Sequence, residues 1–481
     1  MQRAQMFSGP AWPRLALAGG LLLTALLLAW LPWWLAAALI LVPLLVGLIV
    51  LEPALGLYAA ILSVPVQETV RLPTGLTVTQ VVVVLAFGAW LLRLLAHPER
   101  SPRLWLLGPW LVLLGVLLAS AVLSPYSRLE ALLQFARWVA SLLAFILTLG
   151  TISTRHRLWG LVAALLLGPL IAALIGLVQF VVPSTAPESF LILGERFARA
   201  SATFGKPNPF AGYLNMAWPL ALALAIFYAH RALVRTAWRL HATLLALLFG
   251  GATLVLLAGL FASYSRGGWL GASVGLLTLA LAGGRRTTLL AGLGVLLALL
   301  VGLLGAFRVL PPAFTDRLTP VVENLRIFDA GEVAITDDNF AIVERMAHWQ
   351  AGWRMWQAHP LLGVGVGNYN TAYRDFYVAP WAISQGHAHN YYIHMLAESG
   401  LLGLLAYLGL IGAMAYAAIR ARQQGNGTVW GAAAAGVCGI IAAVAGHNVF
   451  ENLHVLNMGI QLSGVWGLAI IAPRLKSEGD A

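Results

Sequence analysis

The stretch LWGLVAALLLGPLIAALIGLVQFVV, residues 158–182, decides the fold class of this chain. It runs for 25 residues without a single Asp, Glu, Lys or Arg. About 20 apolar residues in a helix cross the hydrocarbon core of a bilayer, so a run of this length is typical of a transmembrane helix. The whole chain of 481 residues has the same character, since 60% of it is hydrophobic and only 10% is charged. A soluble domain carries about 25% charged residues. We therefore expect an integral membrane protein.

Further apolar stretches follow the same pattern on both sides of this segment. They cover residues 15–31, 34–50, 53–66, 77–95, 105–123, 129–149, 209–228, 244–261, 269–281, 287–304, 391–418, 431–445 and 458–471. The third of them is short enough for a re-entrant segment. Backbone polar groups inside lipid must be satisfied within each segment, which favours helices. The sequence predicts an all-α polytopic bundle of about 12–14 transmembrane helices.

Two polar intervals divide the predicted spans. The expected parts are an N-terminal transmembrane bundle (1–182), an outer-face loop (183–208), central transmembrane helices (209–304), a large loop or helical cap (305–390), and C-terminal transmembrane helices with a short tail (391–481). In the large loop, Asp337 or Asp338 is placed to cap a helix over residues 339–358, which His359-Pro360 would end.

Basic residues predict the orientation of the chain. If the N-terminus lies inside, the inner loops and both termini hold 16 of the 29 Lys and Arg residues but only 4 of the 18 acidic residues. This asymmetry follows the positive-inside rule, so we expect both termini in the cytoplasm. The net charge of +11 is then a sign of topology, and we expect no nucleic-acid partner. The single cysteine, Cys438, excludes a disulfide framework within the chain and a multi-cysteine metal site.

Arginines on the predicted outer face need a separate reason, because the charge distribution disfavours them there. Arg199 opens Arg199-Ala-Ser-Ala-Thr-Phe-Gly-Lys-Pro-Asn208, Arg266 lies in Ser263-Tyr-Ser-Arg-Gly-Gly-Trp269, and Arg345 lies on the helix of the large loop. The planar guanidinium binds phosphate oxygens in pairs, so the set favours an anionic ligand. The alternative is that these side chains snorkel or pair with acidic residues: Glu130, Glu344 or Glu398.

One further arginine, Arg137, falls inside the predicted span 129–149. An unpaired charge in the membrane costs at least ~2.5 kcal/mol, so this residue also calls for a partner or a ligand.

The segment Gly386-His-Ala-His-Asn390 leads from the large loop into the next span. We expect His389 in the first turn of that helix, where the positive helix end favours a neutral imidazole. A neutral imidazole can accept a proton from a hydroxyl, which is the task of a general base. The alternative is a histidine that caps the helix or lies at the membrane interface.

A metal site competes with this interpretation. His387 and His389 form a His-x-His pair, and His394 and Glu398 share one helix face. Zinc usually takes three protein ligands with fixed geometry, and these two pairs point in different directions. We therefore predict neither a metal nor a cofactor. Three polar residues of the next hairpin are interpreted as polar packing at the interface: His447, Glu451 and His454.

Together these segments resemble the O-antigen ligase and polymerase superfamily of membrane proteins. Four pieces stand in the family's order: RASATF (199–204) with Pro207-Asn208, SRGG (265–268), Arg345 ahead of HPLLGVGVGN (359–368), and His389-Asn390 followed after nine residues by Gly400 and then Gly403. The last piece is similar to the ligase signature of His, a small polar residue, nine positions and Gly. The chain departs from many members at Ser201-Ala202, where they have glycine, and at Lys206, which adds a charge.

The resemblance implies a GT-C-like glycosyltransferase of the bacterial inner membrane with its site on the periplasmic side. Such an enzyme is inverting and metal-independent, and its donor is a glycan on undecaprenyl diphosphate. By position, Arg199 and Arg266 would hold the diphosphate, Arg345 would help to orient it, and His389 would deprotonate the acceptor hydroxyl. Three neighbouring polar residues would support the pocket: Lys206, Asn208 and Asn390.

Several acceptors are compatible with these motifs. A ligase would use lipid A-core, a polymerase would use another glycan, and a protein O-oligosaccharyltransferase would use a Ser or Thr hydroxyl. Membrane lipids would surround each of them. A transporter, such as a bicarbonate carrier, is the alternative from another class. It should place ionisable residues at mid-membrane and show inverted repeats, whereas here the charged set lies at the outer interface.

Overall fold

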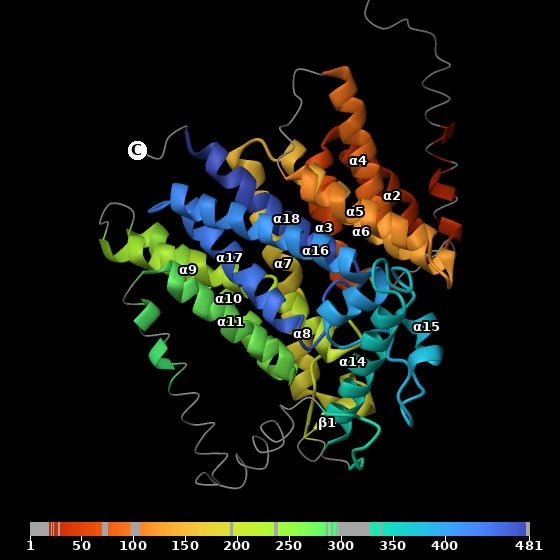
Figure 1. Cartoon of the computed structure of the whole chain (residues 1–481). Coiled ribbons are helices and arrows are strands. Elements are labelled where there is room, and N and C mark those ends of the chain that lie inside the picture. Colours follow the sequence, from red (N-terminus) through yellow and green to blue (C-terminus); the bar gives the residue numbers. More distant parts are fainter. Residues whose placement is uncertain are drawn as a thin grey trace, which may run out of the picture.

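The computed structural model is a bundle of long helices with a smaller helical cap at one end (Figure 1). The structure describes residues 19–20, 22, 24–26, 29–69, 76–97, 106–192, 196–234, 239–284, 287–289, 292–294, 296, 328–336 and 339–477. The helices of the bundle are α2 (Trp33–Leu51), α3 (Pro53–Ser63), α4 (Val78–Ala96), α5 (Leu107–Val122), α6 (Arg128–Thr151), α7 (Arg155–Val181), α8 (Pro207–Asn215), α9 (Trp218–Val234), α10 (Arg239–Ala262), α11 (Arg266–Ala282), α16 (Tyr391–Gln424), α17 (Val429–His447) and α18 (Met458–Ile471).

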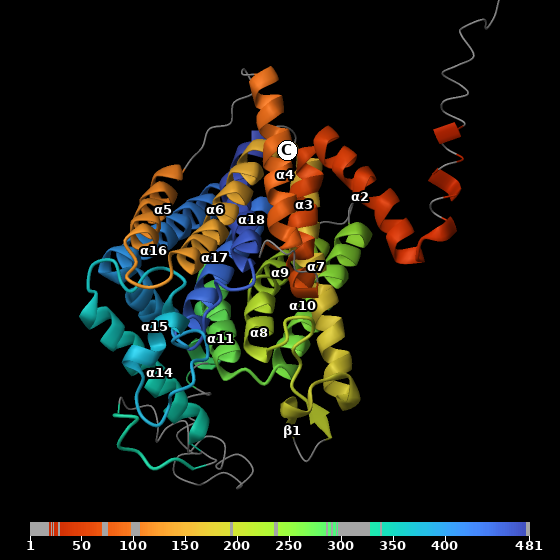
Figure 2. The ribbon, with the colours of Figure 1, turned by 90° about the vertical axis from the view of Figure 1, so that its right-hand side faces the viewer.

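The cap consists of α14 (Phe340–Ala358), α15 (Tyr369–Phe376) and the segments that join them to α16. A two-stranded antiparallel ribbon, β1 (Leu191–Ile192) and β2 (Phe197–Ala198), lies at the same end of the bundle (Figure 2). Short 3-10 turns complete the described structure: Val64–Thr69, Pro183–Thr185, Glu188–Phe190 and Ala472–Ser477.

The all-α polytopic fold expected from the sequence is confirmed. Every predicted span that falls within the described residues coincides with a helix, whereas the predicted spans 15–31 and 287–304 are described only in part. Among the described residues, 7 helices are long and apolar enough to cross a membrane: α4, α6, α7, α8 with α9, α10, α16 and α17. Three shorter apolar helices accompany them, and α11 and α18 have 17 and 14 residues. These five helices are shorter than the roughly 20 residues that a straight membrane span needs, and this is what distinguishes them from the seven.

Capping residues at the polar boundaries fix where several helices begin. Thr77 and Gln80 form a capping box at the start of α4. The hydroxyl of Ser127 accepts a hydrogen bond from the backbone N–H of Glu130, and Thr428 does the same for Gly431 at the start of α17. A side-chain oxygen at this position satisfies backbone N–H groups that have no partner within the helix.

Small residues bring α11 close to α17. A Cβ atom added to Gly271 would lie 2.6 Å from the carbonyl oxygen of Ala443, and one added to Gly275 would lie 2.9 Å from the Cβ of Ala443. Packing through small residues is how membrane helices gain van der Waals contact. It places the first residue of α11, Arg266, beside the end of α17.

The cap is fastened to a break in α16. Gly400 has φ +66°, and the backbone of Leu361 lies against the space where its Cβ would be. The backbone N–H of Leu401 donates to the carbonyl of Pro360 at 2.8 Å, and that of Gly365 donates to the carbonyl of Glu398 at 2.9 Å. The HPLLGVGVGN segment therefore docks on this helix through its backbone, which explains why glycine stands at position 400.

The helix predicted over residues 339–358 is present as α14, with Asn339 at its N-cap. Asn339 exchanges two hydrogen bonds with Thr336, at 2.8 and 3.3 Å. Asp337 and Asp338, which we expected to cap this helix, lie outside the described residues. The expected end at His359-Pro360 is confirmed, since His359 is the C-cap.

Two sets of arginines lie at opposite ends of the bundle. The set at the end away from the cap belongs to the residues predicted to face the cytoplasm: Arg155, Arg157, Arg231, Arg239, Arg420 and Arg422. At the cap end, α8, α11, α14 and the start of α16 come together (Figure 2). The second set, described next, lies there.

Candidate functional site

Glu451, in the connection between α17 and α18, is the centre of a polar cluster at the cap end. Its side chain is 3% exposed. Its Oε1 atom lies 3.2 Å from Nε2 of His387 and 3.8 Å from Nδ1 of His389, and its Oε2 atom accepts a hydrogen bond of 2.6 Å from the amide of Asn208. Burial raises the pKa of Glu451, but His387, His389 and Arg345 outweigh it and hold that pKa well below its usual value. The cluster therefore contains a buried carboxylate.

The interpretation of Glu451 from the sequence missed its contacts with His387, His389 and Asn208. We expected it to share a face with His447 and His454 as interfacial packing. Instead, Nε2 of His454 lies 2.9 Å from the hydroxyl of Tyr407, and His447 contacts the amide of Asn215 at 3.5 Å. Glu451 is the one carboxylate in residues 429–477, and its place in the polar stretch HNVFENLHVLN (447–457) was the signal that could have marked it.

Arg199 is tied to this cluster through Asn208. Its Nε atom donates to the carbonyl oxygen of Ser263 at 3.1 Å, and its terminal nitrogen donates to Oδ1 of Asn208 at 3.4 Å. Burial, followed by the charges of Arg345 and Arg266, lowers the pKa of Arg199. The three arginines that were singled out in the sequence thus lie near enough to repel one another.

Arg266 is the first residue of α11, and its position follows from the serines before it. The hydroxyl of Ser265 caps the helix by accepting the backbone N–H of Gly268 at 3.2 Å. The hydroxyl of Ser263 in turn accepts the N–H of Ser265 at 3.2 Å. Arg266 is exposed at this helix start, where the unpaired backbone N–H groups also favour anions.

The positive charge at the site exceeds the negative charge. Within the part of the chain that the structure describes, no hydrogen bond or ion pair engages the guanidinium of Arg266 or Arg345 with another described residue. Lys206, the exposed N-cap residue of α8, adds a charge near His387. Glu451 compensates only part of this charge, so the site is suited to an anion.

His389 lies just before α16 rather than in its first turn, which corrects our expectation. Its φ is +52°, and the helix starts at Tyr391 after the N-cap residue Asn390. Asn390 has the local role of accepting the backbone N–H groups of Tyr392 and Ile393 at 3.0 and 3.1 Å. The residue turned into the site is therefore His389, and Asn390 holds the helix start beside it.

Both ring nitrogens of His389 are buried and have no hydrogen-bond partner among the described residues. Its ring packs edge-on against His387 at 4.2 Å and against His348 at 5.6 Å between centroids. Nδ1 lies 3.8 Å from Oε1 of Glu451, and Nε2, although buried, has no partner among the described residues. A histidine with one nitrogen directed at a carboxylate and the other free has the arrangement of a general base.

The hydrogen bonds of His387 indicate its tautomer. The backbone N–H of His389 donates to its Nδ1 at 3.1 Å, so the neutral ring carries its proton on Nε2 and donates it to Glu451. Burial is the main reason that the pKa of His387 is lowered to about 3. His387 is thus a neutral hydrogen-bond donor that holds the carboxylate in place.

The same three side chains have the spacing of a metal site. One ligand atom each from His387, His389 and Glu451 lies within 4.8 Å of the others. A metal at His387 would need the lone pair of Nε2, and the ring proton would then move to Nδ1 and displace the backbone donor. The hydrogen bonds of His387 therefore favour a protein network over a metal. His394 and Glu398, the other predicted pair, lie together at 3.4 Å within α16.

Comparison with known families bears on this arrangement. Residues 251–408 match the family model described as O-antigen ligase. The resemblance to the O-antigen ligase superfamily is confirmed. The matched O-antigen ligase segment includes Arg266, Arg345 and His389, while Arg199 precedes it. It supports a membrane enzyme of the glycosyltransferase type.

Two other comparisons concern the whole chain and not only the O-antigen ligase segment. A solved structure, described as "Structural coordination of polymerization and crosslinking by a peptidoglycan synthase complex", is similar at 16% identity with a TM-score of 0.41. The similarity covers 79% of this chain and 99% of that chain. No curated protein matches the chain.

Proposed function

We propose that the chain transfers a glycan from undecaprenyl diphosphate to an acceptor hydroxyl, with inversion and without a metal ion. The observation that carries the proposal is a cluster in which three arginines lie near one another and a histidine lies beside a buried carboxylate. Arg199, Arg266 and Arg345 interact electrostatically, and Asn208 links Arg199 to the Glu451 that faces His389. The O-antigen ligase match supports the same class of reaction.

The arginines are suited to a diphosphate leaving group. As the bond between the sugar and the diphosphate breaks, negative charge grows on the departing oxygen. Fixed positive groups stabilise such charge without having to reorganise during the reaction. Arg266 and Arg345 are the guanidiniums whose hydrogen-bond donors are not used by described residues, so we assign them the closest contacts to the phosphates.

His389 supplies the base in this proposal. Its Nε2 accepts the proton of the acceptor hydroxyl while the oxygen attacks the anomeric carbon on the face opposite the diphosphate. One C–O bond forms, the C–O bond to the diphosphate breaks, and the electron pair leaves on the phosphate. The imidazolium that results lies beside the Glu451 carboxylate, which stabilises it.

We place the reaction on the periplasmic side of the bacterial inner membrane, as the distribution of basic residues predicts. The acceptor is a lipid A-core hydroxyl if the chain is a ligase. A second lipid-linked glycan would make it a polymerase, and a Ser or Thr hydroxyl would make it a protein O-oligosaccharyltransferase.

A transfer assay tests the proposal. Purified protein receives a glycan on undecaprenyl diphosphate and, in parallel, each of these three acceptors in the presence of a chelator. We expect inverted product with one acceptor, and no product when the donor carries a monophosphate. Transfer that requires an added divalent metal, or that proceeds equally from the monophosphate, would contradict the proposal.

A further inference from the structure

Arg137 of α6 has a position that the transfer reaction does not explain. The start of α6 lies at the cap, where the backbone N–H of Ser127 donates to Oδ1 of Asn368 at 3.2 Å. Arg137 is ten residues further along, roughly 15 Å into the bundle at 1.5 Å per residue. It is exposed on the helix surface, so in a bilayer it meets lipid. An ionisable residue at such depth marks a ligand site more often than a packing site.

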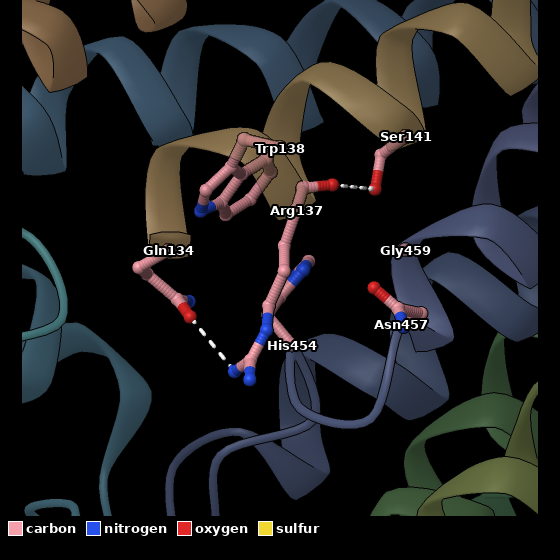
Figure 3. Close-up of a pocket in the computed structure, with 7 residues that line it drawn as sticks. All are labelled: Gln134, Arg137, Trp138, Ser141, His454, Asn457 and Gly459. Carbon is pink, nitrogen blue, oxygen red and sulfur yellow. Dashed lines mark hydrogen bonds between the residues drawn. The ribbon is translucent and has the colours of Figure 1, made fainter. Parts of the chain in front are cut away.

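The charge of Arg137 is not balanced by a carboxylate. Its terminal nitrogen donates to Oε1 of Gln134 at 3.0 Å, and no ion pair joins it to any acidic residue in the described ranges. Side chains of a helix lean toward its N-terminus, so the guanidinium points back toward the cap end (Figure 3). This direction brings the charge closer to the lipid headgroups of the leaflet at that end than the backbone of Arg137 is.

The side chain of Arg137 lines a small pocket between α6 and the start of α18 (Figure 3). The lining residues come from α6 and from the segment that leads into α18: Gln134, Arg137, Trp138, Ser141, His454, Asn457 and Gly459. Gly459 leaves room at the side of Ser141, because a Cβ at position 459 would collide with that hydroxyl. The pocket is a polar recess of about 10 Å³, which is room for about one water, so a larger ligand would lie across its mouth.

Asn457 provides a second, independent sign of a ligand. It is 5% exposed, and its Nδ2 donates to Oγ1 of Thr77 at 2.9 Å and to Oε1 of Gln67. Its Oδ1 is buried and has no partner among the described residues, and Figure 3 shows this oxygen on the side of Arg137. A buried acceptor without a donor is costly, so a ligand hydroxyl or a water is expected there.

An aromatic layer separates this pocket from the candidate site. Trp138 stacks on His454 at 5.0 Å between centroids, and His454 stacks on Tyr391 at 4.5 Å. Tyr391 follows Asn390 and His389 in the chain, so the layer stands between the two regions. Arg137 is therefore a different site from the one formed by Arg199, Arg266 and Arg345.

We propose that Arg137, Gln134 and Asn457 bind the phosphate headgroup of a membrane lipid. The guanidinium would contact the phosphate oxygens, and Oδ1 of Asn457 would accept a hydrogen bond from a glycerol hydroxyl or from a protonated phosphate oxygen. Two lipids carry this phosphate chemistry: bulk phosphatidylglycerol and the carrier lipid undecaprenyl phosphate. Binding at Arg137 does not depend on the proposed transfer reaction, and it is measured without turnover.

Native mass spectrometry of the purified full chain in detergent tests this site, with phosphatidylglycerol and undecaprenyl phosphate as separate probes and diacylglycerol as the phosphate-free control. We expect Arg137→Gln to weaken the binding of one probe by about tenfold or more, because a charged hydrogen-bonding pair is lost. Arg137→Lys keeps the charge without the planar fork and should show a smaller loss.

Arg420→Gln is the matched control, because Arg420 lies on α16 at the end away from the cap and donates to the hydroxyl of Tyr416 at 3.0 Å. It should bind both probes as the wild type does. Loss confined to phosphatidylglycerol identifies a phospholipid site, and loss confined to undecaprenyl phosphate identifies a carrier-lipid site. If Arg137→Gln and Arg137→Lys bind both probes like the wild type, or if diacylglycerol binds equally well, the proposal is wrong.

Discussion

Asn208 donates a hydrogen bond of 2.6 Å to Glu451 although 243 positions separate them in the chain. The same side chain accepts from Arg199. One amide therefore connects the start of α8, the loop that carries Arg199, and the connection between α17 and α18. Since Glu451 also faces His387 and His389, this contact joins the proposed anion-binding part of the site to its proposed base.

Replacement of His389 tests the base. A general base contributes ~10²–10⁴-fold to rate, so His389→Ala should reduce turnover by about that factor. Donor binding should persist, because the arginines hold the diphosphate. Turnover and donor affinity are measured separately on the purified protein, with His230→Ala, an exposed residue of α9 at the other end, as control. Wild-type turnover in His389→Ala would rule out this role.

Lysine substitutions test the arginines. Arg266→Lys and Arg345→Lys should each lower transfer by about tenfold or more, because an ammonium cannot bind two phosphate oxygens as a guanidinium does. Arg354→Lys is the control on the cap, where this exposed arginine donates to the carbonyl of Tyr377 at 3.0 Å. Membrane insertion is followed in parallel. Full activity in both lysine variants would mean that the arginines are structural.

Glu451→Gln tests whether the carboxylate acts through His389. The amide oxygen can still accept from Asn208, but the charge beside His389 is lost. We expect kcat to fall by about tenfold or more while KM for the donor stays nearly constant. A rise in KM with unchanged kcat would instead assign Glu451 to donor binding. Glu451→Asp retains the charge and should recover part of kcat.

Acid should destabilise the protein partly through His387. Its pKa is lowered from 6.5 to about 3 in the folded chain, mainly by burial. The unfolded chain therefore binds the extra proton between these values, and stability falls as the pH decreases from about 7 toward 3. The thermal midpoint of His387→Gln should decline less over this range than that of the wild type. His230→Gln should follow the wild type, and equal declines in all three proteins would contradict the assignment.

Cysteine labelling tests the orientation. In a Cys438→Ala background, Glu332→Cys in the exposed cap segment should react with an impermeant thiol reagent in intact cells. Asn426→Cys, in the turn between α16 and α17, should react only after the membrane is opened. Labelling in the opposite pattern would reverse the predicted topology and remove the periplasmic assignment.

The sequence by itself determined the fold class and the ends of many helices. Hydropathy is a local property, and a long uncharged run such as 158–182 can satisfy its backbone in lipid only as a helix. Capping is local too, because Ser127 and Thr428 act on backbone groups three residues away. The motifs around Arg199, Arg266 and His389 also stand in the family's order along the chain, so the resemblance is recognisable from the residues alone.

The composition of the site was decided only by the tertiary structure. Glu451 lies in a hairpin far from His387 and Asn208 in sequence, and local periodicity contains no information on which loops meet when helices pack. Sequence reasoning grouped it with His447 and His454 and placed His389 inside a helix turn. In the folded chain, His389 instead lies before the N-cap residue of α16. The connection between α17 and α18 places Glu451 beside its side chain. Close packing of α11 on α17 brings these loops together, and that packing depends on contacts between distant residues.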